Sequence, residues 1–314
     1  MNRKYLLGAA IVALVAGSGA AQAADVLPVV AAMVPAPEDT VDPLTLEIEA
    51  GFAGFWVPSD SVQDYGAYLV GSMTYKTTTG WGIEVDFDGL VDLGDGDFGA
   101  SGEVEFFRSF GAFGVGVVFG AGGGFGAPYY YFGPTLRYET DTITAKVQLT
   151  ADFVAGVHEG YSLYTEAEFT PSDRLALGFW LGVGFDGGGI LGYAGAVEAA
   201  FDVVEKVTLH GIVGFDGPGG GVGTHFAGGI AAELNLGVIS PYVGVLFDGD
   251  TAYVAGVALE YQLGNGPFTL VGNAGAVFLP GDPTVYRANI GIRFNHGDAD
   301  DGKLGFFDDF LLPI

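Results

Sequence analysis

Acidic side chains recur at every second residue in several stretches of this sequence. Alternate residues of a β-strand point to the same face of a sheet, so each stretch gathers its carboxylates on one face. Basic side chains fall on the same alternate face but are fewer, and such a face attracts cations where it meets water. We predict that one common surface carries Glu47, Glu49, Glu84, Asp86, Glu103, Glu105, Arg137, Lys146, Glu166, Glu168, Arg174, Arg287 and Arg293.

The spacing of these charges predicts which of them are neighbours. If Phe153 opposes Tyr161 across a hairpin, then Lys146 opposes Glu168. The tight turns on either side are expected to place Arg137 opposite Lys146 and Glu168 opposite Arg174. Like charges directly opposite each other destabilise a sheet, so the two bases need water or further acids beside them. The predicted row of Arg137, Lys146, Glu168 and Arg174 is either a ring that selects ions or an ordinary charge-balanced wall.

The residues that could perform catalysis are few. The chain has no cysteine and only four histidines, His158, His210, His225 and His296, and no set of nucleophile, base and orienting residue is recognisable. His210 and His225 are expected nearly opposite each other on one hairpin, but two imidazoles without a third ligand favour polar wall residues over a metal site. We therefore predict no enzyme activity, no metal site and no cofactor.

The elements that position these charges are predicted strands. From residue 43 to residue 294 the chain divides into segments of about 10 to 13 residues with one apolar face, close to the length of a tilted strand that crosses a membrane. In the segment from residue 285 to residue 294, Tyr286, Ile290 and Phe294 share the apolar face, whereas Arg287 and Arg293 share the other. The pattern predicts an all-β fold, a transmembrane antiparallel up-and-down β-barrel of sixteen strands, with fourteen or eighteen as alternative counts.

The ends of the chain are expected to lie outside this barrel. Residues 1–23 have basic residues, an apolar run and small residues before Ala24, which is typical of a cleaved export signal. Residues 24–42 are predicted to form a periplasmic leader, and residues 295–314 an acidic C-terminal tail. The formal net charge of −27 makes nucleic acid an improbable partner.

Two features of the segments support a membrane location. Connections after odd-numbered segments are rich in glycine and aspartate, whereas most of the others are tighter, which matches long outer loops and short periplasmic turns. Aromatic residues fall near segment ends, as in the girdles of membrane barrels; examples are Trp56, Tyr65, Trp81, Phe98 and Tyr161. A soluble secreted β-sandwich that buries the same apolar face is the alternative.

The chain resembles a Gram-negative outer-membrane porin of the sixteen-stranded general diffusion type. The final strand VYRANIGIRF, residues 285–294, is similar to the aromatic-ended strand that the barrel assembly machinery recognises, and residues 110–120, FGAFGVGVVFG, resemble glycine-aromatic hairpins of porins. The resemblance implies a channel for small hydrophilic solutes, contact with outer-membrane lipid, and a homotrimer as one oligomeric state. The connection at residues 120–128 is much shorter than the porin loop that narrows the pore, so a narrow eyelet is not expected.

We therefore predict an outer-membrane passive diffusion channel that mildly prefers cations. The alternative within the same fold is a structural or adhesive barrel whose lumen is plugged by side chains or by a terminal segment. Bulky residues on the predicted inner face favour that alternative: Phe55, Tyr68, Phe107, Tyr129, Tyr131, Tyr164 and Trp180.

Overall fold

The described part of the chain consists of strands and short connections. The computed structural model describes residues 44–57, 62–94, 96–124, 127–218, 224–248, 250–278, 281 and 283–296. Within these ranges no helix is long and apolar enough to span a membrane. The predicted export signal, leader and C-terminal tail lie outside the described residues, apart from the first residues of the tail, Asn295 and His296, which end the last strand.

Sixteen strands follow one another along the chain, which confirms the predicted count. Six strands begin at the residue predicted from the alternation, and the others begin within four residues of the predicted start. The six starts are Leu44, Trp81, Phe98, Tyr129, Phe268 and Val285. The strands are β1 Leu44–Val57, β2 Val62–Lys76, β3 Trp81–Asp92, β4 Phe98–Phe110, β5 Phe113–Gly123, β6 Tyr129–Glu139, β7 Ile143–Val154, β8 Val157–Ser172, β9 Leu175–Asp186, β10 Gly189–Val204, β11 Val207–Pro218, β12 His225–Leu234, β13 Ile239–Asp248, β14 Asp250–Gln262, β15 Phe268–Phe278 and β16 Val285–His296.

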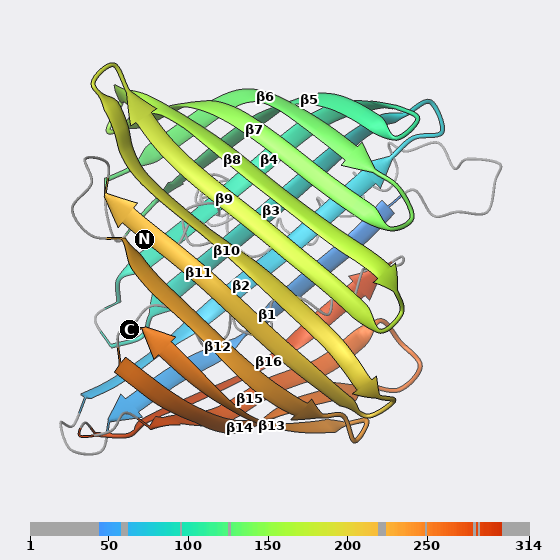
Figure 1. Ribbon diagram of the computed structural model, residues 1–314, viewed down its shortest axis with the longest axis vertical. Coiled ribbons are helices and arrows are strands. Elements are labelled where there is room, and N and C mark those ends of the chain that lie inside the picture. The colour runs from blue at the N-terminus through green and yellow to red at the C-terminus, as the bar shows by residue number, and fades with distance from the viewer. Residues whose placement is uncertain are drawn as a thin grey trace.

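The strands form one closed antiparallel barrel (Figure 1). Each strand pairs with its neighbour in sequence, and β16 pairs with β1 from Leu46 opposite His296 to Trp56 opposite Tyr286. The backbone hydrogen bonds therefore close on themselves and leave no free sheet edge. This topology excludes the two-layer β-sandwich that the sequence also allowed.

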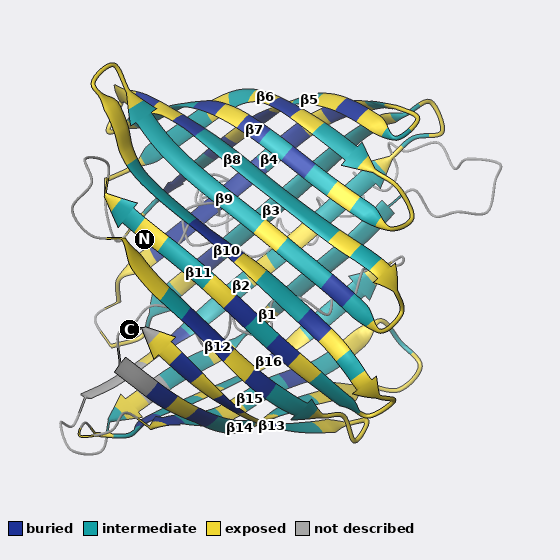
Figure 2. Cartoon of the chain, viewed as in Figure 1, coloured by how far each residue is buried: buried dark blue, intermediate teal, exposed yellow. Residues whose placement is uncertain are grey.

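Alternation along the strands gives the barrel two different faces (Figure 2). Large apolar side chains on one face are exposed. Examples are Phe52, Val117, Ile230 and Val243, with relative exposures of 60%, 59%, 66% and 61%. The opposite face holds the buried carboxylates, amides and hydroxyls. Polar side chains from non-adjacent strands contact one another on this face, as Lys146 on β7 and Glu103 on β4 do, so it is the concave inner face and the apolar face is the outer one.

The predicted aromatic positions lie on this outer face. Trp56, Tyr65, Trp81, Phe98 and Tyr161 are all exposed. Near the end of β4, the outward guanidinium of Arg108 lies 5.2 Å from the ring centre of Trp81 and 5.1 Å from that of Phe110. Aromatic rings therefore lie at the ends of several strands, and two of them, Trp81 and Phe110, shield this outward cation.

The barrel has two rims, which we name by the chain ends. The terminal rim holds the start of β1 and the end of β16, and the far rim lies at the opposite end of the strands. The connections at both rims are short: those after β11 and β15, from Pro218 to His225 and from Phe278 to Val285, are the longest. The predicted contrast between long and short connections is weak because the strands extend into the glycine-rich segments.

Candidate functional site

The inner face of β3 and β4 brings carboxylates into direct opposition. Glu84 opposes Glu105, and Asp86 opposes Glu103. Opposed carboxylates repel each other, so this arrangement needs cations on the same face. Two strands away, Arg137 of β6 opposes Lys146 of β7, as the sequence predicted.

The two bases compensate the carboxylates. Arg137 forms an ion pair with Glu84, and its Nε lies 3.2 Å from Glu105 Oε1. Lys146 Nζ lies 3.3 Å from Glu84 Oε1, 3.1 Å from Glu103 Oε1 and 3.2 Å from Glu105 Oε2. We call these five residues the charged wall. The two bases thereby offset the repulsion between the carboxylates, and the carboxylates offset the repulsion between the bases. With three carboxylates and two bases, the charged wall keeps one negative charge in excess.

Neutral side chains complete the charged wall. Tyr131 donates its hydroxyl proton to Glu103 at 2.6 Å, and Gln148 Nε2 donates to the same carboxylate at 2.9 Å. Thr135 donates to Glu105 at 2.5 Å. Glu105 and Thr135 have relative exposures of 0% and 1%. These side chains are held against the barrel wall and do not extend into the lumen.

Glycines on β5 allow the charged wall to form. β5 separates the acids of β4 from the bases of β6, and its inward positions include Gly114, Gly116 and Gly120. A Cβ at Gly116 would lie 2.6 Å from Thr135 Oγ1 and 2.9 Å from Glu105 Oε1. The long side chains of β4 and β6 therefore meet over β5 only because this position lacks a side chain.

A second charge cluster lies where the barrel closes. Arg293 opposes Glu49, and its Nε lies 3.0 Å from Glu49 Oε2 and 3.6 Å from Glu47 Oε1. Its Nη1 lies 3.0 Å from Glu260 Oε1 on β14. Three carboxylates thus share one guanidinium, and the excess charge of this cluster is also negative. Tyr68 donates to Glu49 at 2.7 Å.

Of the remaining predicted residues, three lie on the inner face outside both clusters and one lies in an exposed turn. Glu166 opposes Lys146 and accepts a hydrogen bond from Tyr164 at 3.0 Å. Glu168 opposes Thr144, and Arg287 opposes Gly275. Both are partly buried on the inner face. Arg174 is exposed in the turn between β8 and β9 and joins neither cluster, so its predicted pairing with Glu168 is wrong, and Glu168 opposes Gly178 on β9 instead.

The predicted pairing of Lys146 with Glu168 is wrong by two residues. β7 and β8 join through a two-residue turn in which Ala155 and Gly156 both have positive φ, 50° and 83°, as in a type I′ turn. A register shift follows between Asp152 and Phe153. The hairpin is therefore tighter than expected, and Glu166 takes the place opposite Lys146.

The expected proximity of the two histidines is also wrong. His225 opposes Asp216, whereas His210 opposes Ala231, six residues further along β12. His210 Nε2 lies 3.0 Å from Glu233 Oε2 on the inner face, and the exposed His225 lies 3.7 Å from Asp216. In the described ranges no three His, Asp or Glu side chains are grouped so that they could hold a metal ion.

Most of the bulky inward residues lie over glycines. Tyr131 opposes Gly120, Tyr129 opposes Gly122, and Phe107 opposes Gly82, and in each pair the ring occupies the place of the missing Cβ. Tyr68 opposes Gly51, and its hydroxyl oxygen lies 2.7 Å from the place of a Cβ there. These rings cover the wall and do not project across the lumen, so they narrow it less than the sequence suggests. The side chain of Phe55 lies outside the described part.

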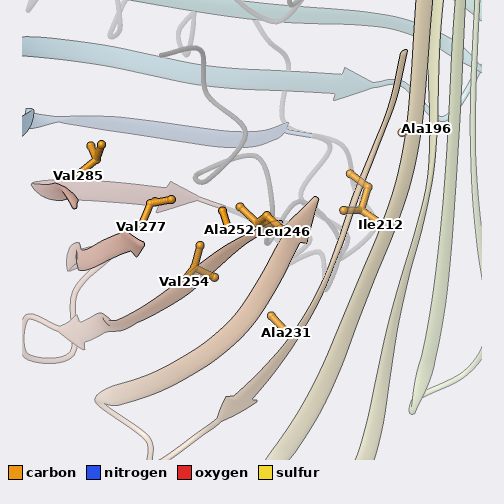
Figure 3. Close-up of a cluster of buried hydrophobic side chains, with 8 residues drawn as sticks. All are labelled: Ala196, Ile212, Ala231, Leu246, Ala252, Val254, Val277 and Val285. Atoms are coloured by element: carbon orange, nitrogen blue, oxygen red, sulfur yellow. The ribbon is translucent and has the colours of Figure 1, made fainter. Parts of the chain in front are cut away.

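An apolar patch on the opposite inner wall was missed by the sequence analysis. Eight buried residues from β10 to β16 make up this patch (Figure 3): Ala196, Ile212, Ala231, Leu246, Ala252, Val254, Val277 and Val285. Val254 opposes Val277, which opposes Val285 in turn. The sequence contains only a weak indication of this patch. β13, β14 and β15 are apolar on both faces, so their alternation between polar and apolar residues is faint.

Known structures share this fold. A triple mutant of the porin of Rhodopseudomonas blastica matches with a TM-score of 0.55 at 15% identity, covering 81% of this chain and 100% of that chain. A multiple mutant of the same porin matches with a TM-score of 0.55 at 16% identity and the same coverage. No protein-family model and no curated protein sequence matches. The chain therefore has the closed sixteen-stranded barrel of a porin.

Proposed function

We propose that the protein is an outer-membrane porin: a passive aqueous channel for small hydrophilic solutes and ions, with a mild preference for cations. The observation that carries the proposal is the difference between the two faces of the barrel. The outer face exposes large apolar side chains, and the inner face holds the charged wall and the Arg293 cluster. Lipid solvates the first face and water the second.

The strand number supports an open lumen. Barrels of about 16 to 18 strands are wide enough to leave an aqueous channel. No described connection is long enough to fold deeply into the barrel, since the longest have six residues between strands. The transport step is diffusion, with no covalent chemistry and no cofactor.

The charges on the inner face support the cation preference. The charged wall has three carboxylates and two bases, and the Arg293 cluster has three carboxylates and one base. Glu166 and Glu168 add to this excess, while Arg287 reduces it. A negative lumen raises the local concentration of cations and lowers that of anions.

The predicted export signal and the barrel together support the proposed location and partners. Outer-membrane barrels with an even strand count return both ends to the periplasm, so the terminal rim faces the periplasm in this proposal. The partners are outer-membrane lipid, the barrel assembly machinery at residues 285–294, and a second and third copy of the chain if it forms the homotrimer typical of porins.

Reconstitution into planar lipid bilayers tests the channel. The purified mature protein is added to one side, and folding is verified by the heat-dependent mobility of the barrel on a denaturing gel. We expect stepwise increases in current of uniform size. A folded preparation that inserts into vesicles but gives no steps would contradict the proposal and favour the plugged barrel.

A further inference from the structure

The apolar patch combines a position on the lumen side with very low exposure. Ala231 and Val254 have a relative exposure of 1%, and Ala196 has 3%, although all three face the lumen. Within the described ranges, two partly buried apolar side chains pack against the patch. They are Val57 of β1 and Trp180 of β9, which lie on its two flanks. The small side chains in the middle of the patch need a further apolar cover to exclude water.

We propose that residues 26–37 of the mature chain enter the lumen and pack across the apolar patch. This stretch, VLPVVAAMVPAP, contains no charged residue and consists of aliphatic residues, Met and Pro. It therefore matches the chemistry of the patch. Left in water at a chain end, it would expose more apolar surface than a soluble segment normally does.

The C-terminal tail is a poorer occupant. Residues 297–314 contain five aspartates and one lysine. The inner wall carries an excess of carboxylates beside the patch, including Glu233 and Glu260 on the same strands. Bringing further aspartates into this lumen costs Coulomb energy, whereas residues 26–37 carry no charge that opposes entry.

The length of the leader fits the position of the patch. β1 begins at Leu44 on the terminal rim, and the patch extends to Val277 and Val285 next to the far rim. β16 has 12 residues, so at a tilt of about 45° the barrel wall is about 28 Å high. The ten residues from Leu44 back to Val34 can span about 33 Å when extended. Residues 26–37 can therefore reach the whole patch.

The consequence is a lumen that is occupied on one side. The leader covers the apolar patch on one side of the lumen, and solutes pass along the charged wall on the other side. Ions then travel closer to Glu84, Glu103 and Glu105 than they would in an empty barrel, which strengthens the cation preference. The proposal concerns the occupancy of the lumen, and its test does not require ion flow.

Chemical labelling of introduced cysteines tests this occupancy, since the natural chain has none. Ala231→Cys reports on the patch, and Val70→Cys, at an inward site that is 38% exposed, is the matched control. In the folded mature protein, we expect a water-soluble maleimide to label Ala231→Cys at least tenfold more slowly than Val70→Cys. Deleting residues 26–37 should raise the Ala231→Cys rate to that of the control, and deleting residues 297–314 should leave it unchanged.

Disulfide cross-linking tests the same contact in the full mature chain, in case the deletion impairs folding. Ala231→Cys is combined in turn with Val30→Cys, Ala32→Cys and Val34→Cys, and the control pairs use Val70→Cys instead. We expect at least one patch pair to cross-link on mild oxidation and the control pairs not to. The proposal is overturned if no patch pair cross-links, or if the leader deletion leaves the labelling rate unchanged in a folded barrel. A protein that conducts no ions but shows the cross-link would refute the channel and keep this inference.

Discussion

The two inner walls of the barrel use the same alternating backbone in opposite ways. On β3 to β7, Glu105 and Lys146 are buried because each satisfies the charge of the other. On β10 to β16, Val254 and Ala231 are equally buried but have no polar partner to hold them. The first wall is complete in itself, and the second requires an apolar cover. Burial at the inner face of this barrel therefore has two physical causes.

Removing a base from the charged wall should have the largest effect. Lys146→Met leaves three carboxylates with one cation, and an uncompensated buried charge costs about 3 to 5 kcal/mol of unfolding free energy. Urea unfolding of the folded barrel in detergent measures it. Lys76→Met is the matched control, because its pair with Glu139 is 43% and 50% exposed, and exposed pairs contribute at most about 1 kcal/mol. Equal losses in the two variants would show that the charged wall is not structurally distinct.

Adding a side chain at Gly116 on β5 should lower the free energy of unfolding by less than the loss of Lys146 does. Gly116→Ala places a Cβ 2.7 Å from the carbonyl oxygen of Phe106, as well as against Thr135 and Glu105. Overpacking of this kind costs about 1 to 3 kcal/mol. Gly187→Ala is the control, since no atom lies within 4 Å of its added Cβ, and we expect a change within about 0.5 kcal/mol. The same urea titration compares them, and a neutral Gly116→Ala would remove the reason given for this glycine.

Shortening a side chain of the apolar patch should lower the free energy of unfolding slightly less again. Val254→Ala removes two carbons from a site with 1% exposure, which is worth about 1.6 kcal/mol of transfer free energy. Val70→Ala makes the same change at an inward site that is 38% exposed, where a much smaller loss is expected. If both variants unfold at the same urea concentration, the patch is open to water and the contrast between the two walls fails.

Single charges in the Arg293 cluster should give the smallest effect, which is measured as a change in ion selectivity. Arg293→Gln makes the lumen more negative and should raise the cation preference, while Glu260→Gln should lower it. Reversal potentials measure both. The differences should be clear at 0.1 M salt, where the Debye length is about 10 Å, and should shrink at 1 M, where it is about 3 Å. Shifts of the same sign in both variants would contradict an electrostatic origin.

The sequence predicted the barrel well because its apolar outer face repeats with period two. The starts at Leu44, Trp81, Phe98, Tyr129, Phe268 and Val285 were predicted to the residue. Most of these positions begin strands whose outer residues are apolar and whose inner residues are mainly polar or small, so the pattern fixes which residues face outward. β15 is the exception, because its inner face also carries Val271 and Val277.

The candidate site was predicted less well, because pairing depends on turn geometry. Arg137 was correctly placed opposite Lys146 across a short turn. Glu168 was not, since a type I′ turn at Ala155 and Gly156 and a nearby bulge shift the register, and neither is visible in the hydrophobic pattern. The contact of Lys146 with β3 was also not predicted, because it crosses glycine-lined β5 and depends on the curvature of the wall.

Ion selectivity of the unmodified protein tests the central claim most directly. The mature chain is reconstituted in a planar bilayer between KCl solutions that differ tenfold in concentration, and the current–voltage curve gives the reversal potential. An excess of carboxylates along the lumen predicts a reversal potential with the sign of potassium selectivity, which decreases in magnitude when both solutions are made more concentrated at the same ratio. A reversal potential of zero, or one with the sign of chloride selectivity, would contradict a lumen governed by the charged wall and the Arg293 cluster.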